Sequence, residues 1–203
     1  MRIGLTVSVV VLLCAGTIRA GELEAFAGRT APMRSRRYTT ADFIQNRHLK
    51  AMDMTLEIKG SMVYERNGRL RWQTDSPLKT VTVIDSSTLT HFDAETGKTA
   101  TLDTAKLKQM KELLGNLAAW MSGDIAELRK FCSIRVAGKN TLELVPLAGK
   151  SFAQFAGCSI SFLPDFSGIK SIKINEPSGD TLEITFFNQV LLDKTDDKVW
   201  SVK

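Results

Sequence analysis

The chain offers few side chains for catalysis or metal binding. Its only histidines are His48 and His91, and it has three cysteines. A Ser-His-Asp hydrolase needs a histidine beside a nucleophilic serine, and neither histidine accompanies a Gly-x-Ser-x-Gly turn. A zinc site needs more nitrogen or thiolate ligands than this inventory supplies. We therefore expect no catalytic residue, no metal site and no cofactor, and so no enzyme.

The remaining polar residues do not form a catalytic motif either. Asp42, Asp53, Asp75 and Asp93 stand near the ends of predicted strands, where aspartate usually serves as a turn residue. No glycine-rich loop leads from a strand into a helix, so a phosphate cradle of that kind is absent from the sequence. The net charge of +5 is too small and too scattered for a nucleic-acid-binding surface. We expect no nucleic-acid partner.

The first 20 residues predict a cleaved secretory signal peptide. Arg2 precedes an apolar stretch from residue 3 to residue 15, and the small residue Ala20 closes the segment. That stretch is shorter than the roughly 20 residues a transmembrane helix requires, and the bulky Leu13 before Cys14 disfavours lipoprotein processing. Cleavage after Ala20 leaves one domain, residues 21–203, and lowers the net charge from +5 to +3. We expect this domain to be exported to an oxidising compartment.

Two states are open for the remaining cysteines, Cys132 and Cys158, in that oxidising compartment. They form either a disulfide or two buried free thiols. Both stand at the starts of apolar strands, and one intervening strand would hold them too far apart to bridge without a bend.

Most of the chain alternates with the period of a β-strand. Even positions between residues 56 and 64 are mostly apolar, which predicts one dry face, and odd positions between 57 and 65 are mostly polar. The dry face collects Leu56, Ile58, Met62 and Tyr64, and the polar face collects Glu57, Lys59, Ser61 and Glu65. Asn67-Gly68 then predicts a hairpin, and Leu70 and Trp72 continue the dry face. Further strands are predicted at residues 80–84, 88–92, 99–102, 132–137, 141–147, 157–163, 168–175, 181–188 and 198–202.

Three segments have helical character. Residues 21–28 predict a short helix that Pro32 stops. Residues 105–121 carry apolar side chains at helical spacing, including Leu113, Leu114, Leu117 and Met121. A shorter helix is expected at residues 124–130. The predicted fold is mainly β, an antiparallel unclosed barrel or half-barrel with helices over its concave apolar face. The long helix either lids an apolar cavity or completes a closed core; the residue pattern leaves both open.

A stretch of sequence resembles the periplasmic lipoprotein-carrier family, the LolA-like proteins of Gram-negative bacteria. The resemblance rests on ordered motifs and covers about 150 residues. The motifs are Phe43-Ile44-Gln45-Asn46-Arg47, Gly60 to Trp72, Ser76-Pro77, Ser122-Gly123-Asp124, Leu144-Val145-Pro146 and the hairpin from Glu176 to Gly179-Asp180. Residues 21–40 depart from the family pattern, because Pro32 and three arginines interrupt the long helix expected there. Those arginines (Arg34, Arg36, Arg37) form a solvated loop or contact an acidic headgroup or partner.

The resemblance implies a carrier of lipoproteins or related acylated lipids rather than an enzyme. Such a monomeric carrier takes its cargo from an inner-membrane export complex and delivers it to an outer-membrane acceptor. The alternative is a periplasmic lipid-sensing or regulatory module of the same fold that transfers no cargo. By the resemblance, Arg66 holds the lid closed through contacts to the helices; the other interpretation is a solvated residue beside the hairpin. The expected acyl-chain cavity comprises Met62, Tyr64, Leu70, Trp72, Leu113, Leu114, Leu117 and Met121.

Overall fold

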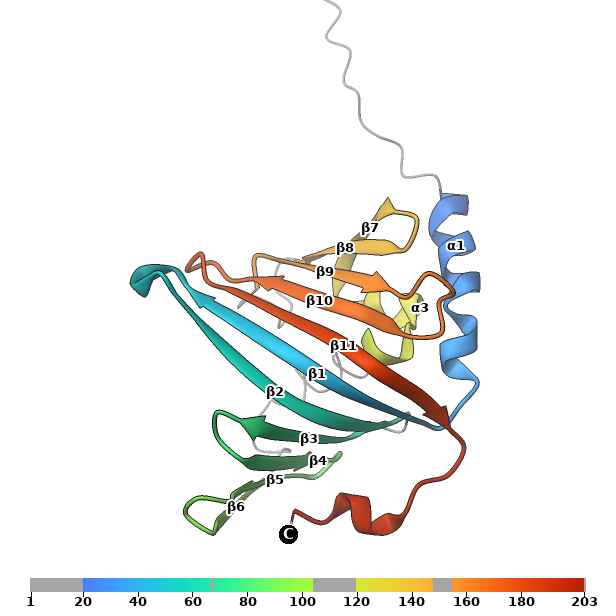
Figure 1. Ribbon diagram of the computed structural model, residues 1–203. Coiled ribbons are helices and arrows are strands. Elements are labelled where there is room, and N and C mark those ends of the chain that lie inside the picture. Colours follow the sequence, from blue (N-terminus) through green and yellow to red (C-terminus); the bar gives the residue numbers. More distant parts are fainter. Residues whose placement is uncertain (1–19, 67, 104–119, 148–154, 203) are drawn as a thin grey trace, which may run out of the picture.

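The structure is a computed structural model, and it describes residues 20–66, 68–103, 120–147 and 155–202. Its 11 described strands form one antiparallel sheet in the order β6-β5-β4-β3-β2-β1-β11-β10-β9-β8-β7. The sheet curls without closing, so β6 and β7 are its two edges (Figure 1). The predicted unclosed antiparallel half-barrel is confirmed. The strands are β1 Tyr38–Leu49, β2 Met54–Glu65, β3 Arg69–Ser76, β4 Thr80–Ile84, β5 Thr88–Asp93, β6 Lys98–Asp103, β7 Cys132–Gly138, β8 Thr141–Pro146, β9 Gly157–Phe162, β10 Ile169–Asn175 and β11 Thr181–Leu192.

Helical segments pack at the ends and on one face of this sheet. Among the described residues they are α1 Ala20–Arg29, η1 Ala31–Arg34, η2 Lys50–Met52, α3 Ile125–Leu128 and η4 Asp197–Trp200. Figure 1 shows α1 beside the ends of β9 and β10 and α3 behind the sheet. Asp124 caps α3 by accepting hydrogen bonds from the backbone nitrogens of Ala126 and Glu127. Most of the long predicted helix lies outside the described residues, although Trp120 to Ser122 are helical.

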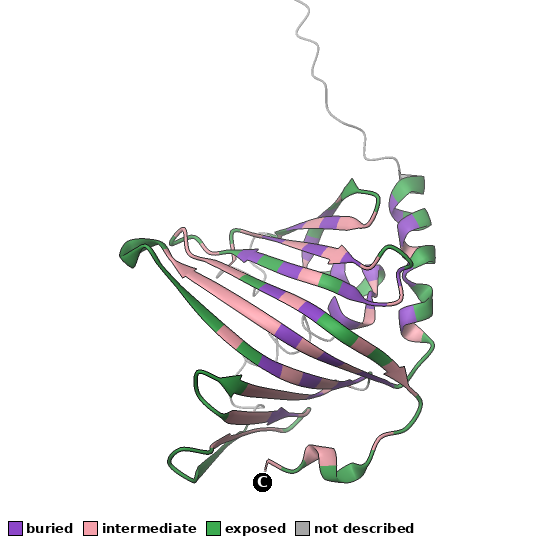
Figure 2. Cartoon of the chain, viewed as in Figure 1, coloured by how far each residue is buried: buried purple, intermediate pink, exposed green. Residues whose placement is uncertain are grey.

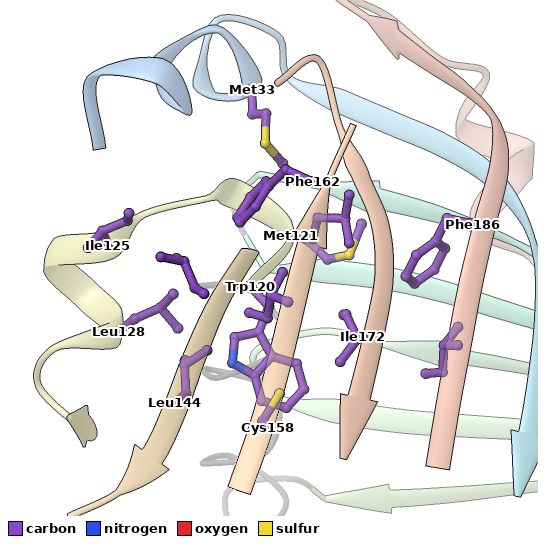
Figure 3. Close-up of a cluster of buried hydrophobic side chains, with 14 of the residues drawn as sticks. Met33, Trp120, Met121, Ile125, Leu128, Leu144, Cys158, Phe162, Ile172 and Phe186 are labelled. Atoms are coloured by element: carbon purple, nitrogen blue, oxygen red, sulfur yellow. The ribbon is translucent and has the colours of Figure 1, made fainter. Parts of the chain in front are cut away.

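Alternation along the strands gives the sheet one dry face, which we call the inner face. Phe43, Phe162 and Ile172 on this face are almost completely buried, whereas Phe187 and Val190 on the outer face of β11 are exposed. Figure 2 shows buried positions alternating with less buried ones along the central strands. The cluster under β8, β9 and β10 also takes in side chains from the helical segments, including Met33, Trp120, Met121 and Leu128 (Figure 3). This cluster is the part of the hydrophobic core under these three strands, and the core continues over β1 and β2 through Phe43 and Met62.

Aromatic contacts fasten α1 to the sheet. Phe26 packs edge-on against Phe162 and Phe166, with ring centroids 5.4 and 5.2 Å apart. The guanidinium of Arg29 lies 3.9 Å from the centre of the Phe166 ring. Next along the chain, the buried hydroxyl of Thr30 donates to the carbonyl of Gly123 over 2.9 Å. The predicted helix before Pro32 is therefore present, and it closes one end of the core.

Leu56 lies on the same face as the buried Met62 and Tyr64, as predicted, but it is 42% exposed because it lies towards the turn of the β1–β2 hairpin. Two details of the sequence prediction are wrong. Glu65, expected on the wet face, is buried among charged and hydroxyl partners. The strand expected at residues 198–202 is replaced by the 3-10 helix η4, whose first turn is capped by the Asp196 carboxylate.

Candidate functional site

The inner face of the sheet carries an open cavity of about 550 Å³. That volume lies within the usual range for small-molecule sites, roughly 300–1,000 Å³. Its described lining is mostly apolar and comes from β1, β3, β4, β10 and β11, with single residues from the segments before α3, before β9 and after β10. The lining residues are Arg47, Leu70, Trp72, Thr82, Ile84, Trp120, Phe155, Ile174, Glu176, Leu182 and Ile184.

Strand register explains why distant residues meet at this cavity. Leu70 on β3 is the cross-strand partner of Ile84 on β4, and Trp72 is the partner of Thr82. On the other side of the cavity, Leu182 on β11 pairs with Ile174 on β10. Cross-strand partners point to the same face of a sheet, and residues two apart on one strand also share a face. The side chains of all these pairs therefore point inward.

The aromatic wall of the cavity is fixed by packing behind it. The Trp72 ring stacks on Phe43 with centroids 4.0 Å apart and an interplanar angle of 26°. Phe186 meets the same indole edge-on at 6.5 Å. Phe43 is completely buried, so Trp72 packs against a side chain that is held in the core.

The structure separates the predicted cavity residues into three groups. Leu70 and Trp72 line the cavity. Met62, Tyr64 and Met121 are buried in the hydrophobic core and do not belong to the described lining. The other predicted residues, Leu113, Leu114 and Leu117, fall outside the described residues.

Sequence reasoning missed most of the lining. Ile174, Leu182 and Ile184 each lie in a predicted strand, but the sequence does not link their shared face to that of Leu70 and Trp72. The sequence did offer one indication: Leu182 and Ile184 are two positions apart on the same predicted strand, so their side chains share a face. What the sequence lacked was the pairing of β1 with β11, which brings residues 38–48 beside residues 181–192.

One ion pair stands in the otherwise apolar lining. Nη2 of Arg47 lies 2.9 Å from Oε1 of Glu176. The side chain of Arg47 is 40% exposed and that of Glu176 is 22% exposed. Both residues belong to stretches that carried the family resemblance, yet neither was singled out from the sequence.

Arg66 lies outside the cavity, at the end of the β2–β3 hairpin. Its backbone nitrogen donates to the carbonyl of Arg37 over 2.9 Å. Its guanidinium donates to the carbonyl of Arg34, the last residue of η1. Arg66 therefore contacts a helix end among the described residues, while its role in gating stays a prediction.

The arginines between residues 34 and 37 make contacts within the chain. Arg34 donates to the carbonyl of Gly123 over 3.1 Å, Arg36 pairs with Asp193, and Arg37 pairs with Glu65 at 2.7 Å. These contacts tie η1 to β2, to the segment after β11 and to the turn before α3.

The titratable groups near the core are held neutral. Burial raises the pKa of Tyr64 to about 12. Burial likewise raises the pKa of Cys132 to about 11 and that of Cys158 to about 12. Both thiols are free and buried, and β8 lies between their strands.

The two histidines contact threonines across neighbouring strands. Nδ1 of His91 is 2.9 Å from the Thr82 hydroxyl, and Nδ1 of His48 is 3.4 Å from the Thr55 hydroxyl. Within the described part of the chain, no group of three or more His, Cys, Asp or Glu side chains is arranged to hold a metal ion. None of the described helices is long and apolar enough to cross a membrane.

Comparison with known proteins identifies relatives by sequence. The family model described as outer membrane lipoprotein carrier protein LolA matches residues 35–203. Outer-membrane lipoprotein carrier proteins from two Coxiella burnetii strains, CbuK_Q154 and RSA 331, are each 30% identical to this chain over 95 residues. Each match covers 45% of this chain and 43% of the relative. The similarity therefore spans less than half the length of these curated relatives.

Solved structures share the fold at low sequence identity. An uncharacterized conserved protein from Thermus thermophilus has a TM-score of 0.54 and 9% identity, covering 88% of this chain and 92% of that one. MucB has a TM-score of 0.53 and 11% identity, covering 90% of this chain and 64% of that one. At these identities the likeness concerns the fold alone.

Proposed function

Because this chain belongs to the family of the outer membrane lipoprotein carrier protein LolA, we propose that it is a periplasmic carrier of acyl chains. The cargo is a lipoprotein or a related acylated lipid, whose chains occupy the cavity on the inner face of the sheet. The observation that carries this proposal is the apolar cavity of about 550 Å³ walled by Trp72, Trp120, Phe155 and Ile184.

The physical basis of such a carrier is the hydrophobic effect. Each methylene group removed from water contributes about 0.8 kcal/mol, so a partly buried acyl chain can travel through water. The cavity is open, so the chain enters and leaves without passing through the closed core beneath β8, β9 and β10. Release requires an acceptor that binds the chain more favourably.

The route follows from the same proposal. Residues 1–20 direct export and are removed after Ala20, which places the domain of residues 21–203 in the periplasm. The protein, as a monomer, receives its cargo from an inner-membrane export complex and delivers it to an outer-membrane acceptor. It transfers cargo without chemical conversion.

A pair of variants on β11 tests the proposal. Leu182 lines the cavity, whereas Phe187 is 41% exposed on the outer face of the same strand. Leu182→Glu places a charge among apolar side chains and is expected to abolish release of a radiolabelled lipoprotein from spheroplasts. Phe187→Glu adds the same charge outside the cavity and is expected to leave release unchanged. Circular dichroism establishes that both variants are folded.

The outcomes separate the carrier from the alternatives. Normal release by Leu182→Glu, or no lipid bound to the wild-type protein from cells, would contradict the proposal. Lipid binding without release, together with binding to a membrane-bound regulator, would favour the lipid-sensing module instead.

A further inference from the structure

The charged residues in the described lining of the cavity are Arg47 and Glu176. They come from the ends of different strands: Arg47 is near the end of β1, and Glu176 directly follows β10. A few polar groups in an apolar lining fix the orientation of a ligand and provide specificity. This pair therefore marks the position at which the cavity can distinguish one cargo from another.

Arg47 has apolar neighbours on both sides. Its cross-strand partners are Leu56 on β2 and Leu182 on β11. A cation flanked by aliphatic side chains attracts an anion more strongly than a fully hydrated one, because the local dielectric constant is lower. The same flanking side chains give an acyl chain a surface to follow next to the charge.

The guanidinium of Arg47 has donors to spare. It carries five N–H groups in a planar fork that matches carboxylate and phosphate oxygens. Glu176 receives one bond, from Nη2. Among the described residues, no other nitrogen of the Arg47 side chain has a hydrogen-bond acceptor. At 40% exposure the side chain is also open to a ligand that arrives from solution.

We propose that Arg47 binds the anionic headgroup of the cargo, a phosphate or carboxylate attached to the acyl chain that fills the cavity. Glu176 has two effects in this site. It holds the guanidinium at the cavity, and it competes with the incoming anion for the same donors. This inference rests on the proposed carrier function, and it narrows the cargo to acylated ligands with a negative charge close to the chain.

Lipids that share an acyl chain but differ in charge test the assignment. The probes are palmitoyl lysophosphatidic acid, which is anionic, and monopalmitoylglycerol, which is neutral, each used as monomers at low ionic strength. The wild-type protein is expected to bind the anionic lipid at least about tenfold more tightly, which corresponds to roughly 1.4 kcal/mol. Added salt should reduce this preference, because ions screen exposed charges.

Substitutions of the pair should shift the preference in opposite directions. Arg47→Gln is expected to abolish the preference by lowering the affinity for the anionic lipid to about that for monopalmitoylglycerol. Binding of the neutral lipid by this variant demonstrates that the cavity is intact. Arg47→Lys, which retains the charge, should keep part of the preference. Glu176→Gln should increase the preference, because it removes the competing carboxylate.

The matched control is an Arg–Glu pair elsewhere in the sheet. Arg135 and Glu143 pair across β7 and β8 and do not belong to the described cavity lining. Arg135→Gln and Glu143→Gln are therefore expected to change neither affinity.

Each failure has a distinct meaning. Equal wild-type affinities for the two lipids, or an unchanged preference in Arg47→Gln, would overturn the headgroup assignment and leave the carrier proposal intact. Inorganic phosphate that binds as tightly as the anionic lipid would overturn the assignment to a lipid headgroup. Failure of the wild-type protein to bind either lipid would overturn the carrier function itself.

Discussion

At the start of β1 and the end of β2, one acidic side chain joins several elements. Glu65 is 5% exposed. Its Oε1 accepts hydrogen bonds from Nη2 of Arg37 at 2.7 Å and from the Tyr38 hydroxyl at 3.3 Å. Its Oε2 lies 3.7 Å from Nε of Arg69. The Glu65 side chain, on β2, therefore links the segment after η1 to β1 and β3.

Removal of this carboxylate should destabilise the protein. Glu65→Ala leaves the buried hydroxyl of Tyr38 without its acceptor and removes the partner of the half-exposed Arg37, and we expect the free energy of unfolding to fall by about 2 kcal/mol in urea denaturation. Glu143→Ala breaks a solvent-exposed ion pair and should cost less than about 1 kcal/mol. Equal losses for the two variants would contradict the structural role of Glu65.

The buried cysteines should be chemically inert in the folded protein. Since only the thiolate reacts and burial raises the pKa of Cys132 to about 11 and that of Cys158 to about 12, a disulfide-exchange reagent at pH 8 should label neither. Both should react once the protein is denatured without reductant. Rapid labelling of the folded protein would contradict the burial, and absence of reactive thiols after denaturation would reveal a disulfide.

The same pKa values make stability depend on pH. A thiol whose pKa is raised by folding stabilises the folded state below its unfolded pKa, and this contribution is lost as the pH rises towards the folded value. We expect the stability difference between wild type and Cys158→Ala to narrow as the pH rises above about 9. Urea denaturation at several pH values measures it, and a difference that widens in that range would contradict the prediction.

At the scale of elements, the sequence motifs that carry the family resemblance meet in one packing unit. Phe43 on β1 is the cross-strand partner of Gly60 on β2, and its ring stacks on Trp72 of β3. A Cβ atom at Gly60 would lie 1.9 Å from the carbonyl oxygen of Gln73 and 2.8 Å from Cζ of Phe43. Gly60 therefore lets three strands approach closely behind the cavity wall.

A methyl group at this glycine should disrupt the unit. Gly60→Ala is expected to lower the free energy of unfolding by about 2 kcal/mol or more, because the clash is with backbone and with a buried ring. Gly138→Ala, where a Cβ atom would meet nothing within 4 Å, should change stability by less than about 0.5 kcal/mol. Comparable urea midpoints for Gly60→Ala and wild type would refute the close packing.

Local pattern was sufficient to predict most elements but not their partners. Alternation located the strands, and Asp124 correctly marked the start of α3. Phe166 lies between the strands predicted at residues 157–163 and 168–175, yet it is 2% exposed because it packs under α1. This contact joins distant parts of the chain. The cavity lining was predicted only in part, for the same reason. Leu70 and Trp72 were predicted because they lie in a local hairpin, whereas Leu182 joins them only through the long-range pairing of β1 with β11.

At the scale of the whole molecule, burial is unequal across the sheet. β9 alternates between buried and half-buried residues, whereas β5 has no buried residue and every residue of β6 is exposed (Figure 2). Regions with few buried apolar contacts open most easily. We expect amide hydrogens of β5 and β6 to exchange fastest among the strands and those of β9 slowest, as measured by hydrogen exchange with mass spectrometry. Equal protection of β6 and β9 would contradict this order.

This unequal burial also has an evolutionary consequence. The residues that hold the fold together lie mainly under β8, β9 and β10, while Thr82 on β4 faces the cavity from the less buried half of the sheet. A substitution at Thr82 can therefore alter the shape offered to a ligand at little cost to the core. Under the proposed carrier function, we expect cargo preference to diverge through such positions more readily than the buried scaffold does.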